Sequence, residues 1–131
     1  HATDADLIAA ERIFSAAGQT ARVSEALMDA VTAVSGSGPA YVFYLAEALA
    51  QAGAAAGLPA DEAARLARQT IIGAAALLEL AKDSPGDLRR KVTTPNGTTQ
   101  AAIVALEAGN FAALIGSAVQ AAARRSAELG K

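Results

Sequence analysis

Four threonine hydroxyls stand on either side of one predicted tight turn, and together they make this stretch a candidate binding site for a small ligand. The turn is predicted at residues 95–97, where the sequence is Pro-Asn-Gly. The apolar run at 101–106 has helical spacing, so the turn leads into a helix N-terminus. The hydroxyls belong to Thr93, Thr94, Thr98 and Thr99.

A junction of this kind favours an anion. The first turn of a helix carries N–H groups without intrahelical partners and the positive end of the helix dipole. Gly97 would let a ligand approach the backbone, because glycine has no Cβ. The competing interpretation is that Thr98 is an ordinary N-cap and that Thr93 and Thr94 are turn residues, since threonine-rich caps are common.

The elements around this turn are predicted to be helices. A helix over 98–108 stops at Gly109, and Asn110 begins a last helix with an apolar stripe at steps of three and four residues. Upstream, the Ser-Pro-Gly-Asp sequence at 84–87 is a cap followed by an N1 proline and an N3 acid, which predicts a short helix. The basic side chains that end it either complement the helix dipole or bind phosphate. They are Arg89, Arg90 and Lys91.

The helix predicted from Pro39 to Ala56 is apolar on all sides and carries one charge, Glu47. A helix that is apolar all round must be buried all round. We expect a second copy of the chain to help cover it; the alternative is a central helix enclosed by its own neighbours. Gly57 ends this helix, and another begins near Pro59 and runs to about Lys82, with its later half apolar on more than one face.

The N-terminal region predicts a helix over 3–17, stopped by Gly18, and a short strand over 19–23. A single strand has no sheet to join, so it is either an extended arm or part of a sheet outside this chain. Ser24 is predicted to cap a helix through Val34, which the small residues at 35–38 then end or kink.

Composition narrows the function classes. The formal net charge is −2, and no basic stripe is present, which argues against nucleic acid or an anionic membrane as partner. There is no cysteine, and the single histidine is His1, so no metal centre is expected. No apolar run reaches the ~18 residues of a spanning helix. We expect a cytoplasmic protein, and a first residue His1 without methionine suggests a tag remnant or a truncated chain.

Three segments of the chain resemble the pyrroline-5-carboxylate reductases. The sequence Val-Thr-Thr-Pro-Asn-Gly-Thr-Thr at 92–99, with Ala-Ala at 101–102 and Leu-Glu at 106–107, is similar to the signature of that family. The segment 29–41, Asp-Ala-Val-Thr-Ala-Val-Ser-Gly-Ser-Gly-Pro-Ala-Tyr, resembles its helical domain, as does the ending at 125–131. The similarity covers nearly the whole chain.

The resemblance implies an all-α fold: a helical bundle that dimerises by interleaving helices, preceded by one helix and one short strand left from an α/β domain. Residues 1–23 would be the end of a Rossmann-type nucleotide-binding domain, and residues 24–131 the helical dimerisation and substrate-binding domain. The Gly-rich dinucleotide fingerprint is absent. Gly36-Ser37-Gly38 does not supply it, because Tyr41 stands at the third glycine position and the preceding residues are predicted helix.

The reaction implied by the resemblance is reduction of the cyclic imine 1-pyrroline-5-carboxylate to L-proline by NADPH or NADH. In matching positions, the Thr94 hydroxyl and the backbone N–H groups of Gly97, Thr98 and Thr99 would hold the substrate carboxylate. The Thr99 hydroxyl would contact the ring nitrogen, and Thr99 would be the catalytic residue. Because threonine is a poor acid, it would orient and polarise the imine rather than donate a proton outright.

Three further positions carry weaker implications. Glu25 matches an acidic position near the family's substrate pocket, although a first-turn glutamate also suits the helix dipole. Lys91 matches a position near the cofactor where some members carry asparagine. Asn96 replaces a residue that is more often glycine or alanine, and asparagine tolerates a left-handed backbone.

The resemblance also bears on assembly and activity. It implies a homodimer and allows further assembly into a larger ring. Without the domain that binds the dinucleotide, residues 1–131 are expected to bind no cofactor and to be inactive alone. Two alternatives stay open: a purely structural dimerisation module, and a related reductase acting on a different imine or keto acid.

Overall fold

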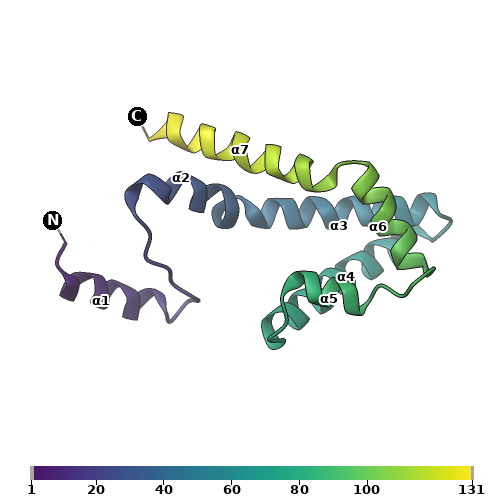
Figure 1. Cartoon of the computed structure of the whole chain (residues 1–131), viewed down its shortest axis with the longest axis horizontal. Helices are drawn as coiled ribbons and strands as arrows, with labels where there is room; N and C mark the ends of the chain where they lie inside the picture. Colours follow the sequence, from purple (N-terminus) through teal and green to yellow (C-terminus); the bar gives the residue numbers. More distant parts are fainter. Residues whose placement is uncertain (1, 131) are drawn as a thin grey trace.

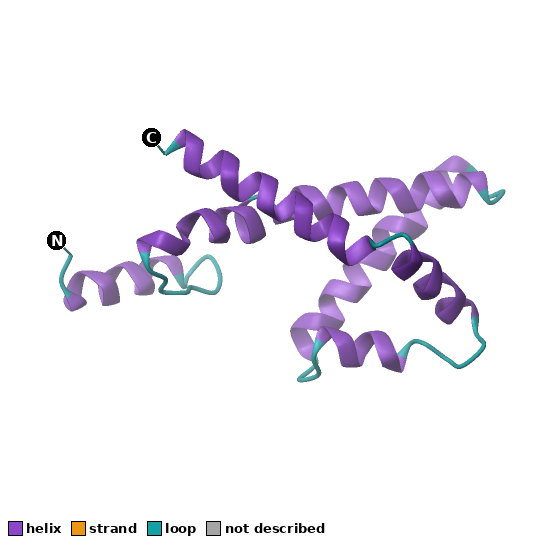
Figure 2. Ribbon diagram, turned by 45° about the horizontal axis from the view of Figure 1, so that its top comes forward, coloured by secondary structure: helices purple, strands orange, loops and turns teal. Residues whose placement is uncertain are grey.

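The computed structural model describes residues 2–130, and every regular element in that range is helical (Figures 1 and 2). The expected all-α fold is therefore confirmed. His1, the single histidine, and Lys131, the last residue of the resemblance at 125–131, lie outside the described residues. In chain order the elements are α1 (Asp4–Phe14), the 3-10 helix η1 (Glu25–Leu27), α2 (Met28–Val31), the π-helix η2 (Thr32–Gly36), α3 (Gly38–Ala55), α4 (Ala60–Leu80), α5 (Pro85–Lys91), α6 (Thr98–Ala108) and α7 (Phe111–Leu129).

Local signals explain where several helices begin and end. The Thr3 side chain accepts from the Asp6 N–H while the Asp6 carboxylate accepts from the Thr3 N–H, which makes a capping box for α1. The Ser84 hydroxyl accepts from the Asp87 N–H at the start of α5 in the same way. Gly57 has φ +105°, a conformation that glycine adopts without strain, and it separates α3 from α4.

The N-terminal segment differs from the sequence prediction. The helix predicted to residue 17 ends at Phe14. The segment 19–23 pairs with no other strand within residues 2–130, which fits both alternatives stated above, an extended arm and part of a sheet outside this chain. The Arg22 guanidinium of this segment binds the Glu11 carboxylate of α1, with Nε 2.5 Å from Oε1. This hydrogen-bonded ion pair lowers the pKa of Glu11 and raises the pKa of Arg22.

The helix predicted from Ser24 to Val34 is not continuous. Ser24 occupies the N-cap position of η1, but its side chain accepts no capping hydrogen bond. A 3-10 turn, one turn of α-helix and a π-helical turn follow one another before α3 begins. The kink expected at residues 35–38 is therefore present, and it takes the form of a widened π-helical turn.

The helices pack as two open layers (Figure 1). The α3 and α4 helices lie against each other, and α7 lies along α2 and η2, while α6 contacts α7. Gly53 of α3 faces Ala63 of α4 so closely that a Cβ on Gly53 would stand 3.2 Å from the Ala63 Cβ. Small side chains thus let these two helix axes approach.

The chain lacks a hydrophobic core of its own. Within residues 2–130 the buried apolar residues are Ala33, Ala63 and Ala67, and α3 buries none of its side chains. The alternative that α3 is enclosed by its own neighbours is therefore wrong. The accessible area is 10364 Å², whereas a compact monomer of this mass would expose roughly 6,400 Å². An excess of roughly 4,000 Å² per chain, or roughly 8,000 Å² for two chains, is at least as large as the total area that obligate dimers bury.

Candidate functional site

The predicted turn is present and joins α5 to α6. The Gly97 N–H donates to the Thr94 carbonyl oxygen at 3.0 Å, which closes the turn. Asn96 has φ +58°, so the left-handed backbone expected at this position is confirmed. The Asn96 N–H donates to Oε1 of Gln100, at 2.5 Å, so a side chain in the first turn of α6 fixes the turn from the other side.

The start of α6 presents unpaired hydrogen-bond donors. In the part of the chain that the structure describes, no carbonyl or side chain accepts from the Thr98 or Thr99 N–H groups. The hydroxyls of Thr94, Thr98 and Thr99 also form no hydrogen bond with any described residue. Thr94 and Thr98 are exposed, and Gly97 and Thr99 are half-buried. Two amides and three hydroxyls are therefore available at one helix N-terminus.

Gly97 lets the Thr94 side chain lie over the backbone of the turn. A Cβ built on Gly97 would stand 2.3 Å from the Thr94 Oγ1 and 3.1 Å from the Thr94 carbonyl oxygen. Any other residue at 97 would push the hydroxyl away. The glycine is thus required by the position of Thr94, and not by an unusual φ, since its φ is −86°.

Two details of the sequence prediction are corrected here. The Gly97 amide is not an unpaired donor, because the turn itself uses it. The N-cap of α6 is Gly97 and not Thr98, and no side chain caps it. The Thr93 hydroxyl is also occupied, since it donates to the Arg89 carbonyl oxygen at 2.6 Å. The sequence could not reveal these bonds, because they depend on how the turn closes.

The role of Gln100 was missed by sequence reasoning, although a signal for it existed. A glutamine three residues after an N-cap commonly reaches back to a backbone N–H in a capping box. Here Gln100 is three residues after Gly97, and it accepts from the residue just before that cap. Placing the cap at Gly97 would have predicted that Gln100 accepts from the Gly97 N–H; because the Thr94 carbonyl already uses that N–H, Gln100 accepts from Asn96 instead.

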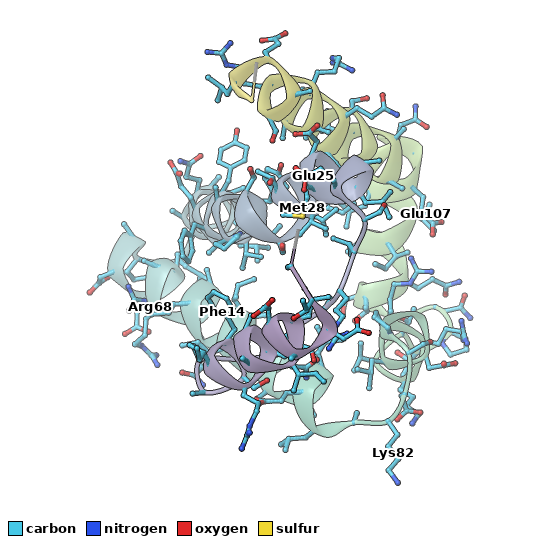
Figure 3. All side chains as sticks on the ribbon, turned by 90° about the vertical axis from the view of Figure 1, so that its left-hand side faces the viewer. Phe14, Glu25, Met28, Arg68, Lys82 and Glu107 are labelled. Atoms are coloured by element: carbon cyan, nitrogen blue, oxygen red, sulfur yellow. The ribbon has the colours of Figure 1, made fainter. Side chains whose placement is uncertain are left out.

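Glu25 and Lys91 are not brought into the turn. Glu25 is exposed on η1, beside Met28 (Figure 3). The η1 helix adjoins α2 at one end of α3. The turn before α6 lies toward the other end of α3 (Figure 1). The Lys91 Nζ binds the Asp83 carboxylate at 2.7 Å. Within one chain these two residues and the threonines do not form a single site.

The basic residues that end α5 are all paired, which argues against the phosphate-binding interpretation. Arg90 bonds to Asp87, one turn earlier in the same helix. Arg89 lies 3.8 Å from the Glu107 carboxylate of α6, and Lys91 is held by Asp83 as described. A phosphate would have to displace a carboxylate from each cation.

The Gly-rich segment at residues 36–38 does not have the geometry of a dinucleotide-binding loop. Gly36 lies in the π-helical turn and Gly38 begins α3, so this Gly-rich segment is not the loop between a strand and a helix that holds a pyrophosphate. No cluster of three metal-ligating side chains is found within residues 2–130. No single helix in that range is long and apolar enough to span a membrane; α6 and α7 pass only when taken together, with a 52° bend between them.

Comparison with known proteins identifies the relatives of this chain. The family model described as pyrroline-5-carboxylate reductase dimerisation matches residues 25–129. A pyrroline-5-carboxylate reductase of Synechocystis sp. is 52% identical over 125 residues, which are 95% of this chain and 47% of the relative. The chain therefore spans about half the length of the curated relatives it matches.

The chain is also similar to solved structures of pyrroline-5-carboxylate reductases. A pyrroline-5-carboxylate reductase from Coxiella burnetii matches with a TM-score of 0.92 and 40% identity, over 99% of this chain and 48% of that one. A pyrroline carboxylate reductase from Plasmodium falciparum, solved with NADP bound, matches with a TM-score of 0.86 and 30% identity, over 100% of this chain and 53% of that one. The chain belongs to the pyrroline-5-carboxylate reductase family, and residues 25–129 match its dimerisation domain.

Proposed function

We propose that this chain is the substrate-binding and dimerisation portion of an enzyme that reduces 1-pyrroline-5-carboxylate to L-proline with NADPH or NADH. The observation that carries the proposal is the group of unpaired donors at the start of α6, in a chain of this family. The substrate is a small carboxylate with a ring nitrogen. Both features call for fixed hydrogen-bond donors.

The substrate carboxylate is held by the Thr98 and Thr99 amides and by the Thr94 hydroxyl. The two amides belong to the first turn of an 11-residue helix, where the dipole adds a favourable field for an anion. Gly97 contributes space rather than a donor, because its own N–H closes the turn. The three donors have no competing partner among the described residues, so binding a carboxylate breaks no protein hydrogen bond.

We propose that the Thr99 hydroxyl donates a hydrogen bond to the neutral ring nitrogen, or accepts one from the N–H of the protonated ring nitrogen, and so fixes the plane of the imine. A threonine hydroxyl is too weak an acid to be the main proton source at neutral pH. Its contribution is orientation of the C=N bond and polarisation of it. Thr99 is half-buried on α6, which limits the side-chain motion that would blur this geometry.

The nicotinamide cofactor, when bound, would supply the hydride for the imine carbon. The Gly-rich segment at 36–38 is not a dinucleotide-binding loop, so we propose that the cofactor binds outside the described residues, and we expect residues 1–131 alone to bind none and to be inactive. Lys91 could reach a cofactor only by releasing Asp83. Glu25 could join the threonines only from a second chain, because the two regions lie toward opposite ends of α3 (Figure 1).

A homodimer is part of the proposal, with further assembly into a ring as an open extension. The support is the exposed apolar surface of α3 and α4 together with the excess area of roughly 4,000 Å². We propose a cytoplasmic location, which suits a chain without cysteine.

The decisive experiment replaces Thr99 in the full-length enzyme that carries this domain. Thr99→Val keeps the shape of the side chain but removes the donor, and we expect kcat/KM for the imine to fall roughly 100-fold. Thr99→Ser should retain most of the activity. The matched control is Thr93→Val, because the Thr93 hydroxyl is used within the fold, by the Arg89 carbonyl, and not by substrate.

Three results would contradict the proposal. Equal activity in Thr99→Val and the unaltered enzyme would remove the role given to that hydroxyl. Failure of proline or an unreactive ring analogue to bind the full-length protein would favour a purely structural module. A higher kcat/KM for a six-membered cyclic imine or a keto acid than for the five-membered ring would favour a related reductase.

A further inference from the structure

The junction between α2 and α3 has an unusual backbone. Residues Thr32–Gly36 form a π-helical turn, in which the Ser37 N–H donates to the Thr32 carbonyl oxygen at 2.8 Å, five residues earlier. Isolated π-turns within helices are rare and occur often at functional positions. The local sequence Ser-Gly-Ser-Gly-Pro is small and flexible apart from its proline.

Pro39 explains why the helix widens here. Proline has no N–H, and in a continuous α-helix its ring would clash with the carbonyl four residues earlier, which is that of Ser35. A wider turn before the proline relieves this clash. Pro39 itself then lies in the first turn of α3, where a proline is well tolerated.

One side chain reaches from α3 back to this turn. The Tyr41 hydroxyl donates to the Ala33 carbonyl oxygen at 3.0 Å, in a partly buried position. Ala33 is fully buried. The other side-chain bond in the region, from the Ser35 hydroxyl to the Val31 carbonyl oxygen at 2.9 Å, joins the turn to α2 and not to α3. In the described chain, the Tyr41 bond is therefore the side-chain hydrogen bond that ties the π-turn to α3.

The turn joins α2 to α3 and packs against α7. On one side α3 packs against α4, and on the other α7 packs against α2 and η2 (Figure 1). A change of angle at the π-turn would move α2, and with it η1 and the N-terminal arm, relative to the α3–α4 layer. Within the described residues, the π-turn is restrained by its packing against α2, α3 and α7, where Ala33 is buried, and by the Tyr41 bond.

We propose that residues 32–37 are a hinge and that the Tyr41 hydroxyl is its latch. With the bond to Ala33 formed, the π-turn is fixed and α2 is held at one angle to α3. With the bond broken, the glycine-rich turn opens, and the N-terminal segment moves relative to the helical layers. Tyr41 is thus a positioning residue. The inference does not depend on the proposed reaction.

The chain contains a matched control for this latch. Tyr44 lies one turn further along α3, but it is 72% exposed and makes no hydrogen bond to any described residue. Tyr41→Phe and Tyr44→Phe each remove one hydroxyl from the same helix and keep the ring. A difference between them therefore reports the Tyr41 hydrogen bond and not the loss of a tyrosine hydroxyl in general.

The experiment is amide hydrogen exchange, measured on this chain for both variants. We expect Tyr41→Phe to speed exchange of the amides at 34–38 by about two- to tenfold, the effect of losing one hydrogen bond. Exchange in α4 should stay unchanged. Tyr44→Phe should leave both regions as in the unaltered chain.

Several outcomes would overturn the latch. One is equal exchange at 34–38 in the two variants, and another is no change in either. A third is equal acceleration in α4 and at 34–38, because that would indicate global destabilisation instead of a local opening. A weaker helical circular dichroism signal in Tyr41→Phe would also contradict the proposal, because the loss of one local hydrogen bond should not unfold the chain.

Discussion

Phe43 offers the sharpest test of the dimer, because it is a large apolar side chain left exposed in the middle of a helix. It is 71% exposed on α3 and borders a hollow of about 500 Å³ between α3 and α4. Ile71 and Ile72 of α4 line the same hollow, with Ile72 53% exposed. We predict that this face is covered by a second copy, so Phe43→Ser should weaken dimerisation.

The size of the effect follows from the area that Phe43 still exposes. Full burial of a phenylalanine side chain contributes about 1.5–3 kcal/mol, and an exposed fraction of 71% leaves about 1–2 kcal/mol to be gained at the interface. A two-fold symmetric dimer contains the residue twice, so the loss is about 2–4 kcal/mol. The dissociation constant should therefore rise roughly 30- to 1,000-fold.

Sedimentation equilibrium from nanomolar to micromolar concentration measures this constant. The matched control is Phe14→Ser, since Phe14 is 66% exposed but lies on α1, away from the α3–α4 face. We expect that control to dimerise as the unaltered chain does. A monomeric unaltered chain at micromolar concentration would refute the dimer, and an equal shift in the two variants would refute the assignment of the interface to α3 and α4.

Two further predictions concern the turn and the N-terminal arm. Gly97→Ala places a Cβ 2.3 Å from the Thr94 hydroxyl, so we expect the variant to lose roughly 1–3 kcal/mol of stability in thermal unfolding and to bind substrate more weakly. The control is Gly116→Ala, because the space around a Cβ at that position is open. Equal losses of stability in the two variants would contradict the close contact at Gly97. The hydrogen bond that Arg22 donates to the Glu11 carboxylate lowers the pKa of Glu11. The stability that this ion pair contributes is therefore fully present at pH values above the ordinary glutamate pKa, and it is lost as the pH falls through the lowered pKa. A carboxyl titration of Glu11 by NMR should have its midpoint below 4.5, and a midpoint at or above that value would contradict the ion pair.

The sequence was sufficient to predict the helices that build the site, because their ends carry strong local signals. The helix predicted over 98–108 has those bounds in the structure, and the cap at Ser84 is confirmed by its hydrogen bond to Asp87. Gly57 separates α3 from α4 as expected. Each of these boundaries depends on the conformational preference of one or two residues, which the sequence displays directly.

The errors fall where the backbone depends on groups that a local pattern does not specify. The helix predicted over 3–17 ends at Phe14, because the three residues before Gly18 form turns and do not continue the α-helix. The π-turn at 32–36 needs both the proline after it and the Tyr41 bond across it. The Gly97 amide was expected to be available because a helix N-terminus usually has unpaired amides, but the preceding turn already uses this one.

The location of the donors links the candidate site to the interface. Thr98 and Thr99 belong to α6, and within its own chain α6 packs chiefly on α7. The α7 helix in turn leaves Leu114 and Leu129 largely exposed. A helix supported on so little buried surface is poorly fixed, yet substrate binding requires donors held in place. The second copy that covers the apolar faces would therefore also steady α6, so that assembly and substrate binding are coupled through the same helices.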